Sequence, residues 1–333
     1  SRIAPTGLLS GRAAAARLAS LLLVLAAFGL RLYRLGDVQF SGDEGFTYAL
    51  ASRDYSGLLS EILRLGEPQP AGSFVLEKAW LDLGGRSEFN LRMLNVGFGV
   101  VAVALAWALT LRLTRSRWAA LIAALLVATN PFGLDHSREY RTYAMLACLS
   151  LACLTALFEY ARTRSRVAFA ALVACEWAVI QAHYVAGFLV AALSAIVLVW
   201  WLAARAPARA RRWPRPPGLG TWALSQFIVA GLTLPWLALA RGTADTYPGT
   251  GRGALALWTV VGEEMALFTG ADALAEIAPA LILLGGLAML LGALALWRSP
   301  GRGKAGSLAL GIAFVLPLLA VWAITWIKPI FHA

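Results

Sequence analysis

The chain has 333 residues, of which 59% are hydrophobic and 14% charged, and its formal net charge is +11. Soluble domains are about 45–50% apolar and about 25% charged, so an ordinary soluble domain is excluded. Several apolar runs reach the roughly 20 residues that a helix needs to cross a bilayer. The composition therefore predicts an all-α polytopic membrane protein, and we assign its basic excess to cytoplasmic loops and not to nucleic-acid binding.

The apolar runs between charge clusters predict about nine transmembrane helices and one or two interfacial helices on the extracytoplasmic side. We expect one transmembrane domain over residues 1–333. In chain order the predicted spans are 14–33, 92–111, 117–134, 137–160, 167–184, 186–204, 222–240, 276–297 and 307–327.

The arginines predict the orientation of these spans. Arg12 and Arg17 place the N-terminus in the cytoplasm, and alternate loops then carry basic clusters at 112–117, 162–166, 205–215 and 298–304. The acids gather on the other side, where two long loops, 36–91 and 241–275, are expected. Among the acids only Glu159 lies near a predicted inner loop. These patterns indicate a multi-pass protein of the inner (plasma) membrane whose site faces the periplasm or exterior.

The first outer loop opens with "FSGDEGFTYAL", which places Asp43 beside Glu44. Ser41 and Glu44 have the spacing of a helix capping box, so one interpretation is simply a helix start. Sequence neighbours do not share a helix face, so the two acids are expected to do different jobs. Asp43 can serve as a general base toward an acceptor hydroxyl. Together the two carboxylates could instead hold Mg²⁺ or Mn²⁺, and no other cofactor is expected.

Two stretches of the outer loops predict interfacial helices. In the first loop, "GFTYALASRDYSGLLSEILRLG" has an apolar face that includes Leu58 and Ile62, and we expect it to lie on the membrane surface. In the second loop, "ALALWTVVGEEMALFTG" follows a glycine-rich segment and is the second candidate.

A second polar cluster, "DHSREYRTYAM" at 135–145, is predicted at the outer start of the fourth span. Read as a helix, it places Arg138 and Arg141 on one face, and Glu139 and Tyr143 on one face. The planar guanidinium fork suits phosphate oxygens, which points to a lipid-phosphate ligand. The alternative is that these Tyr and Arg side chains only anchor the helix in the headgroup region.

Three smaller features complete the candidate set. "QAHYV" places His183 and Tyr184 at the outer end of the fifth span, as cavity-lining residues or as structural ones. Glu176 is an acid inside that span and therefore a functional candidate by default. Lys328, at the outer end of the last span, is either a phosphate ligand or a headgroup anchor.

Taken together, these segments resemble the glycosyltransferase C superfamily. The similarity is to the bacterial relatives of protein O-mannosyltransferases and lipid A aminoarabinose transferases. It is carried by "LRLYRLGDVQFSGDEGFTYA", "LEKAWLDLGGRSEFNLRMLNVGFG", "SREYRTYAMLACLSL" and "QAHYVAGFLV". It covers roughly residues 18–200 and is weak afterwards.

The resemblance implies a role for each matching residue. Asp43 would be the catalytic base and Glu44 its partner, while Arg141 would meet the carrier phosphate with Arg138 or Lys328 in support. Glu139, Tyr143, His183 and Tyr184 would line the same outer cavity. The chain departs from the family at "PQPAGSF", where relatives carry "PPL", and it stops at "KPIFHA" where relatives continue. It is therefore either a short member or a piece of a longer, C-terminally truncated chain.

The implied function is an inverting membrane glycosyltransferase. It would move a hexosyl or pentosyl group from a polyprenyl-phosphate donor to a hydroxyl of a lipid, glycan or protein on the extracytoplasmic side. Two alternatives stay open: a transporter or flippase for lipid-linked sugars, and a non-catalytic membrane subunit. The partners expected are the donor, the acceptor and membrane lipids, with no nucleic acid.

Overall fold

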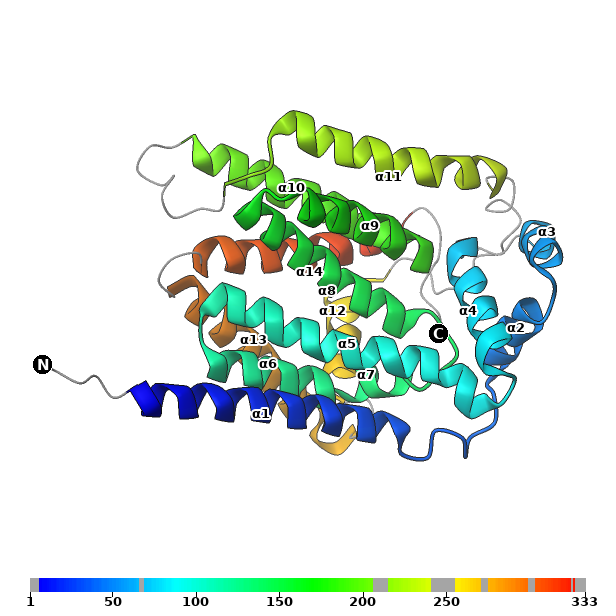
Figure 1. Cartoon of the computed structure of the whole chain (residues 1–333), viewed down its shortest axis with the longest axis horizontal. Coiled ribbons are helices and arrows are strands. Elements are labelled where there is room, and N and C mark those ends of the chain that lie inside the picture. Colours follow the sequence, from blue (N-terminus) through cyan, green and yellow to red (C-terminus); the bar gives the residue numbers. More distant parts are fainter. Residues whose placement is uncertain are drawn as a thin grey trace, which may run out of the picture.

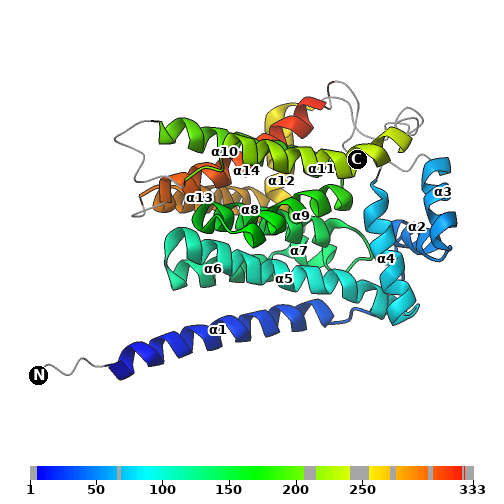
Figure 2. The ribbon, with the colours of Figure 1, turned by 45° about the horizontal axis from the view of Figure 1, so that its top comes forward.

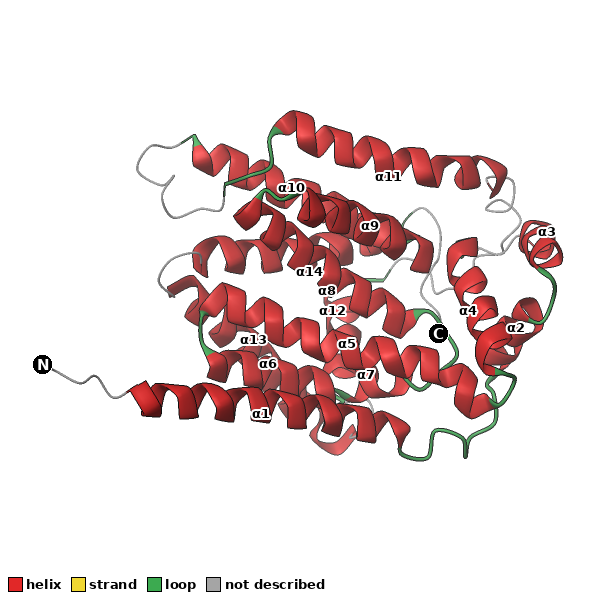
Figure 3. Ribbon diagram, viewed as in Figure 1, coloured by secondary structure: helices red, strands yellow, loops and turns green. Residues whose placement is uncertain are grey.

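The computed structural model describes residues 6–65, 69–205, 215–240, 255–270, 275–298, 303–324 and Trp326. All regular secondary structure within these ranges is helical (Figure 3). In chain order the elements are α1 (Thr6–Leu32), α2 (Gly42–Ala51), α3 (Tyr55–Leu65), α4 (Ala71–Gly84), α5 (Glu88–Thr114), α6 (Arg117–Thr129), α7 (Pro131–His136), α8 (Tyr143–Thr163), α9 (Arg166–Ala182), α10 (Ala186–Ala204), α11 (Leu219–Ala240), α12 (Leu257–Thr269), the 3₁₀ turn η4 (Ala275–Ile277), α13 (Ala278–Arg298) and α14 (Gly303–Ile324).

Six helices of the described chain are long and apolar enough to cross a membrane: α5, α8, α10, α11, α13 and α14. Shorter apolar helices occupy Leu18–Leu32 of α1 and all of α6. The prediction of a multi-pass all-α membrane protein is confirmed. Every predicted span corresponds to a helix, but the total of nine crossings stays a prediction, because α6 and α9 have only 13 and 17 residues.

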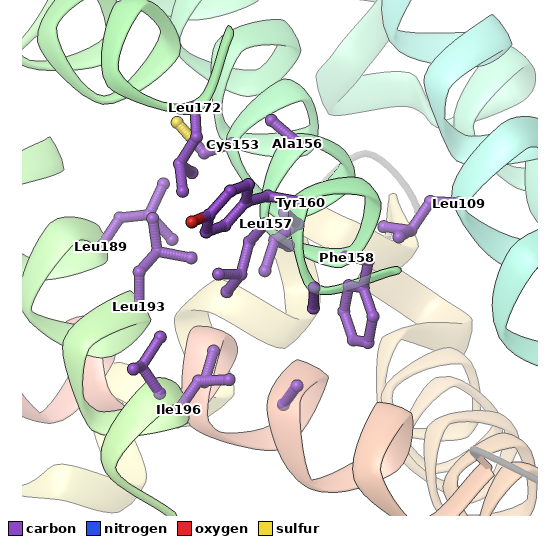
Figure 4. Packing of buried hydrophobic residues seen from close by; sticks show 14 of the residues in the cluster. Leu109, Cys153, Ala156, Leu157, Phe158, Tyr160, Leu172, Leu189, Leu193 and Ile196 are labelled. Atoms are coloured by element: carbon purple, nitrogen blue, oxygen red, sulfur yellow. The ribbon is translucent and has the colours of Figure 1, made fainter. Parts of the chain in front are cut away.

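The long helices pack side by side, and the short helices α2, α3 and α4 gather at one end of the bundle (Figures 1 and 2). The main apolar core lies between α5, α8, α9, α10 and α14. It includes Leu157, Leu193 and Trp200, all fully buried. Figure 4 shows Leu157 and Tyr160 of α8 facing Leu189 and Leu193 of α10. This core holds rigid the helix ends that carry the polar residues described below.

Two helical hairpins at the opposite end of the bundle use the same tetrapeptide, Thr-Arg-Ser-Arg, at 114–117 and 163–166. In each, the arginine adopts a left-handed φ of 57° and closes the first helix, and the serine caps the second. The threonine hydroxyl also accepts a hydrogen bond from the serine amide, at 3.1 and 3.3 Å. A short local motif thus terminates α5 and α8 at equivalent points.

The predicted surface helix in the first outer loop differs in the structure. It is broken into α2 and α3, because Asp54 accepts a hydrogen bond from the Gly57 amide at 3.0 Å and starts a new helix. The apolar residues Leu58 and Ile62 are almost fully buried, in a cluster with Phe74 of α4. Protein rather than lipid therefore covers much of this face. The second predicted interfacial helix is present as α12.

Candidate active site

The two neighbouring acids of the first outer loop lie in opposite environments. Glu44 is 2% exposed, whereas the side chain of Asp43 is 72% exposed. Ser41 caps α2 and forms the predicted capping box with Glu44. Because successive residues of a helix point about 100° apart, burying Glu44 turns Asp43 outward. The prediction that the two acids do different jobs agrees with this geometry.

Glu44 joins three segments of the chain. Its Oε1 accepts hydrogen bonds from Arg92 Nε and from the Tyr140 amide, both at 2.8 Å. Its Oε2 accepts from Arg92 Nη2 at 2.9 Å and from the Ser41 amide at 3.0 Å. Burial alone would raise the pKa of Glu44, but these hydrogen bonds outweigh it and hold the pKa below its usual range.

This arrangement does not fit the predicted divalent-cation pair. A carboxylate has about four lone-pair sites, and all four on Glu44 are occupied by N–H donors. In the described ranges no three His, Cys, Asp or Glu side chains are grouped to hold a metal ion. Arg92, which the sequence patterns did not single out, is the residue that engages Glu44. It also donates to the carbonyls of Leu35 and Val38, at 2.9 and 2.7 Å.

Arg141 lies beside Asp43. Its Nη2 lies 3.5 Å from Asp43 Oδ2, although 98 positions separate the two residues in the chain. Its Nη1 donates to Thr47 Oγ1 at 3.2 Å, and Thr47 in turn donates to the Asp43 carbonyl at 3.1 Å. The Arg141 side chain is 10% exposed, and its Nε has no hydrogen-bond partner among the described residues. A largely buried guanidinium therefore retains unused donor capacity beside an exposed carboxylate.

A second acid near Arg141, Glu77 of α4, is absent from the residues that the sequence patterns single out. It is 2% exposed, and its Oε2 has no hydrogen-bond partner in the described part of the chain. Burial raises the pKa of Glu77 to about 8, and the charge of Arg141 opposes this rise. The Tyr140 hydroxyl donates to the Glu77 carbonyl at 2.6 Å, which holds the segment before Arg141 against α4. The available signal was the Glu77-Lys78 pair, which interrupts an otherwise apolar run between Phe74 and Leu81.

His183 and Tyr184 end α9 and begin the turn into α10. Burial lowers the pKa of His183, and the charge of Arg141 lowers it further. Its Nδ1 lies 3.2 Å from the Val185 amide, which donates to it, so the neutral ring carries its proton on Nε2. The Tyr184 hydroxyl accepts from Trp236 Nε1 of α11 at 2.9 Å. The charge of Arg141 thus acts on both His183 and Glu77, while Tyr184 joins the turn between α9 and α10 to α11.

The predicted helical faces in "DHSREYRTYAM" are wrong. Helix α7 ends at His136 and α8 begins at Tyr143, so the intervening residues form turns and bends. Arg138 is directed to the end of α1, where it donates to the Tyr33 carbonyl at 2.8 Å. Arg141 instead reaches α2. Only one of the two predicted phosphate arginines therefore lies beside Asp43.

The other predicted residues are placed as follows. Glu139 Oε2 lies 3.0 Å from His136 Nδ1, and the ring of Tyr143 lies 5.9 Å from the guanidinium of Arg141. Lys328 falls outside the described residues. Glu176 is fully buried between α9 and α11, where it accepts from Gln226 Nε2 at 3.0 Å, and it is not part of the Asp43–Arg141 group.

The comparisons with known proteins bear on this arrangement. The family model described as dolichyl-phosphate-mannose-protein mannosyltransferase (PMT) matches residues 55–241, more than half of the chain. The chain belongs to the PMT family. The matched range includes Glu77, Arg141 and His183 but begins after Asp43, which therefore rests on its own geometry. A search of curated proteins finds no match.

The fold of this PMT family member has a solved counterpart. The structure of ArnT from Cupriavidus metallidurans in the apo state aligns with a TM-score of 0.52 at 16% identity. The alignment covers 91% of this chain and 59% of ArnT, so the chain spans well under two thirds of the length of that protein. The predicted relationship to the glycosyltransferase C superfamily is confirmed by the family and by the fold.

Proposed function

We propose that this PMT family member is a membrane glycosyltransferase that moves a sugar from a polyprenyl-phosphate donor to an acceptor hydroxyl. The observation that carries the proposal is the 3.5 Å approach of Arg141 to Asp43 at one end of a membrane bundle. A base and a phosphate ligand must belong to one site, because the attacked anomeric carbon is bonded directly to the phosphate oxygen. In an inverting displacement they act on opposite faces of that carbon, so the bound donor has to separate Arg141 from Asp43. The family and the fold support the same reaction class.

Arg141 is the proposed ligand of the donor phosphate. Thr47 holds Nη1 of its guanidinium, but Nε is unpaired and the contact of Nη2 to Asp43 is long at 3.5 Å, so a phosphate can compete for these two groups. Glu77 is the proposed second contact. With a pKa of about 8 it is neutral at pH 7, so its carboxyl can donate a hydrogen bond to a phosphate oxygen and does not repel it. His183, also neutral, can donate from Nε2.

The proposed chemistry is a single displacement. The acceptor hydroxyl attacks the anomeric carbon and gives its proton to Asp43, so a carbon–oxygen bond to the acceptor forms. The bond from the anomeric carbon to the phosphate oxygen breaks, and the configuration inverts. The electron pair stays on the lipid phosphate, whose growing negative charge Arg141 stabilises. Binding of the phosphate also draws Arg141 away from the Asp43 carboxylate, which leaves that carboxylate free to accept the proton.

The proposed site faces the extracytoplasmic side of the inner membrane. The bundle end opposite Asp43 carries Arg112, Arg115, Arg162 and Arg164, and clusters of this kind favour the cytoplasm. A donor with a polyprenyl tail stays in the bilayer, so a site at the end of the bundle can reach its headgroup.

The test uses the full chain, purified and reconstituted in liposomes with dolichyl-phosphate mannose labelled in the sugar. Release of labelled sugar from the lipid is followed with water or a soluble alcohol as acceptor. Asp43→Asn is expected to abolish release, and Arg141→Ala to reduce it by about 10²–10³-fold. Asp54→Asn removes an exposed acid from the same outer segment and should leave the rate unchanged. Undiminished release by Asp43→Asn would overturn the proposal. Transbilayer movement of intact donor without cleavage would point to a flippase instead.

A further inference from the structure

A polar pocket of about 320 Å³ lies at the end of the bundle opposite Asp43 and Arg141. It is formed where α5 and α8 end, and it belongs to neither the candidate site nor the proposed reaction. Both helices begin beside that site, α5 near Arg92 and α8 at Tyr143. The 27 residues of α5 span about 40 Å, so the two ends are a bilayer apart. The pocket is lined by Leu111, Arg112, Leu113, Arg115, Phe158, Glu159 and Arg162.

The charges in the pocket are unbalanced. Arg162 forms a close pair with Glu159 at 2.5 Å, and Arg112 lies 3.6 Å from the same carboxylate. One negative charge therefore faces three positive charges. Because Glu159 is shared, the pocket keeps about two uncompensated guanidinium charges where α5 and α8 end. The leucines and Phe158 add an apolar side to this charged opening.

A comparison of the two Thr-Arg-Ser-Arg hairpins shows that, in the described part of the chain, the pocket arginine Arg115 lacks the contacts made by its counterpart Arg164. Arg164, in the second hairpin, donates to the backbone carbonyls of Arg215 and Pro216 and lies over the Tyr160 ring. Arg115 occupies the same position in the first hairpin, with the same backbone conformation, and lines the pocket. Within the described ranges its side chain has no hydrogen-bond or ion-pair partner. The same local motif thus leaves one arginine satisfied and the other available to a ligand.

We propose that this pocket binds the headgroup of an anionic phospholipid of the leaflet opposite the candidate active site. A phosphodiester fits the guanidinium forks of Arg115 and Arg162, and the apolar side of the pocket meets the first part of the acyl chains. A volume of about 320 Å³ is at the small end of ligand pockets, which suits a headgroup better than a whole lipid. Basic pockets between helices on the cytoplasmic side are known to take such headgroups.

The experiment is native mass spectrometry of the full purified chain, equilibrated with an equal mixture of phosphatidylglycerol and phosphatidylcholine. The wild type is expected to retain phosphatidylglycerol preferentially. Arg112→Gln/Arg115→Gln/Arg162→Gln should weaken this retention at least about tenfold, since each basic residue near an anionic headgroup contributes about a fivefold change. Arg117→Gln/Arg166→Gln/Arg298→Gln removes the same charge from exposed positions at the same end and should retain the lipid.

A single substitution distinguishes loss of lipid binding from misfolding of the triple variant. Arg115→Gln breaks no contact among the described residues, so it should fold normally and still lose about fivefold in phosphatidylglycerol retention. The proposal is overturned if both triple variants lose the lipid equally, because a diffuse positive surface would then suffice. It is also overturned if the wild type shows no preference, or if inorganic phosphate displaces the lipid at equal concentration. None of these readouts depends on sugar transfer, so they are independent of the proposed function.

Discussion

Glu44 and Arg92 form a two-point ion pair, with Nε and Nη2 of the arginine at 2.8 and 2.9 Å from the two carboxylate oxygens. Both side chains are 3% exposed. The pair joins the start of α2 to the start of α5, and the Tyr140 amide brings the segment before α8 to the same carboxylate. This contact determines where Asp43 and Arg141 meet, although neither residue of the pair touches the open side of the site.

Removing one member of this pair is expected to destabilise the fold. Arg92→Met leaves Glu44 buried without its charged partner, and such changes cost about 3–5 kcal/mol. Thermal unfolding in detergent at pH 7 measures the loss. Arg53→Met is the matched control, since the Arg53–Glu61 pair is half exposed at the arginine and worth about 1 kcal/mol or less. Equal unfolding temperatures for the two variants would contradict the assigned role of Glu44.

The pKa of Glu44 gives this pair a pH dependence. Because the folded-state pKa is lowered, the stabilisation is present above the ordinary carboxyl pKa of about 4.3 and is lost as the pH falls through the folded value. When thermal unfolding is followed from pH 7 down to pH 3, the wild type should therefore lose its higher unfolding temperature relative to Glu44→Gln. If the difference in unfolding temperature between the two proteins does not change with pH, the Glu44–Arg92 pair contributes no charge-dependent stability.

Arg141 is expected to act through its guanidinium geometry as well as its charge. Arg141→Lys keeps the charge but loses the fork that contacts Thr47 and Asp43, so we expect donor turnover to fall by about tenfold or more. Arg138→Lys should retain activity because Arg138 contacts the Tyr33 carbonyl instead. Turnover of dolichyl-phosphate mannose by both variants gives the comparison. A larger loss for Arg138→Lys would reassign the phosphate ligand.

Glu77 should give the reaction an alkaline limit. Below its pKa of about 8 the carboxyl is neutral; above it the carboxylate would repel the donor phosphate and pair with Arg141. Turnover by wild type is expected to fall as the pH rises from 7 to 9, mainly through the KM for donor. Glu77→Gln, neutral at every pH, should lose this fall, while Glu77→Leu should bind donor poorly throughout.

The charged groups around Glu77 define the controls for that experiment. On α4 itself Lys78 pairs with Asp82 at 3.1 Å, and the neighbouring segments contribute Tyr140, Arg141, Asp43 and His183, together with the Glu44–Arg92 pair. Asp82→Asn lies little more than one turn from Glu77 and should keep the wild-type pH profile. An unchanged alkaline limb in Glu77→Gln would show that another group titrates.

Thr47 is expected to position Arg141. Thr47→Val keeps the shape of the side chain but removes the oxygen that accepts from Nη1 at 3.2 Å. Losing one hydrogen bond to a charged group corresponds to about a 10–100-fold effect when the group is left unpaired. We expect turnover to fall within this range while Thr47→Ser retains it. Equal activity of the valine and serine variants would remove Thr47 from the site.

The amino-acid pattern alone was enough to predict the class of the protein, most of its helices and the opposite orientations of Asp43 and Glu44. These depend on local rules: the length of apolar runs, the capping box of Ser41, and the fact that neighbouring residues of a helix point apart. The family resemblance also implied that Asp43 and Arg141 serve one reaction, and these roles stay predictions. Hydrophobic and capping patterns can be recognised within a short segment of the chain.

The polar contacts between helices became known from the three-dimensional packing alone. It separated Arg138 from Arg141, because residues 137–142 form a turn where a helix was expected. It paired Arg92 with Glu44, covered Leu58 and Ile62 with α4, and buried Glu77 near Arg141. Each depends on the packing of segments far apart in the chain. Burial makes Glu44 a structural anchor and raises the pKa of Glu77. No short sequence pattern predicts whether such an acid is buried or which distant residues surround it.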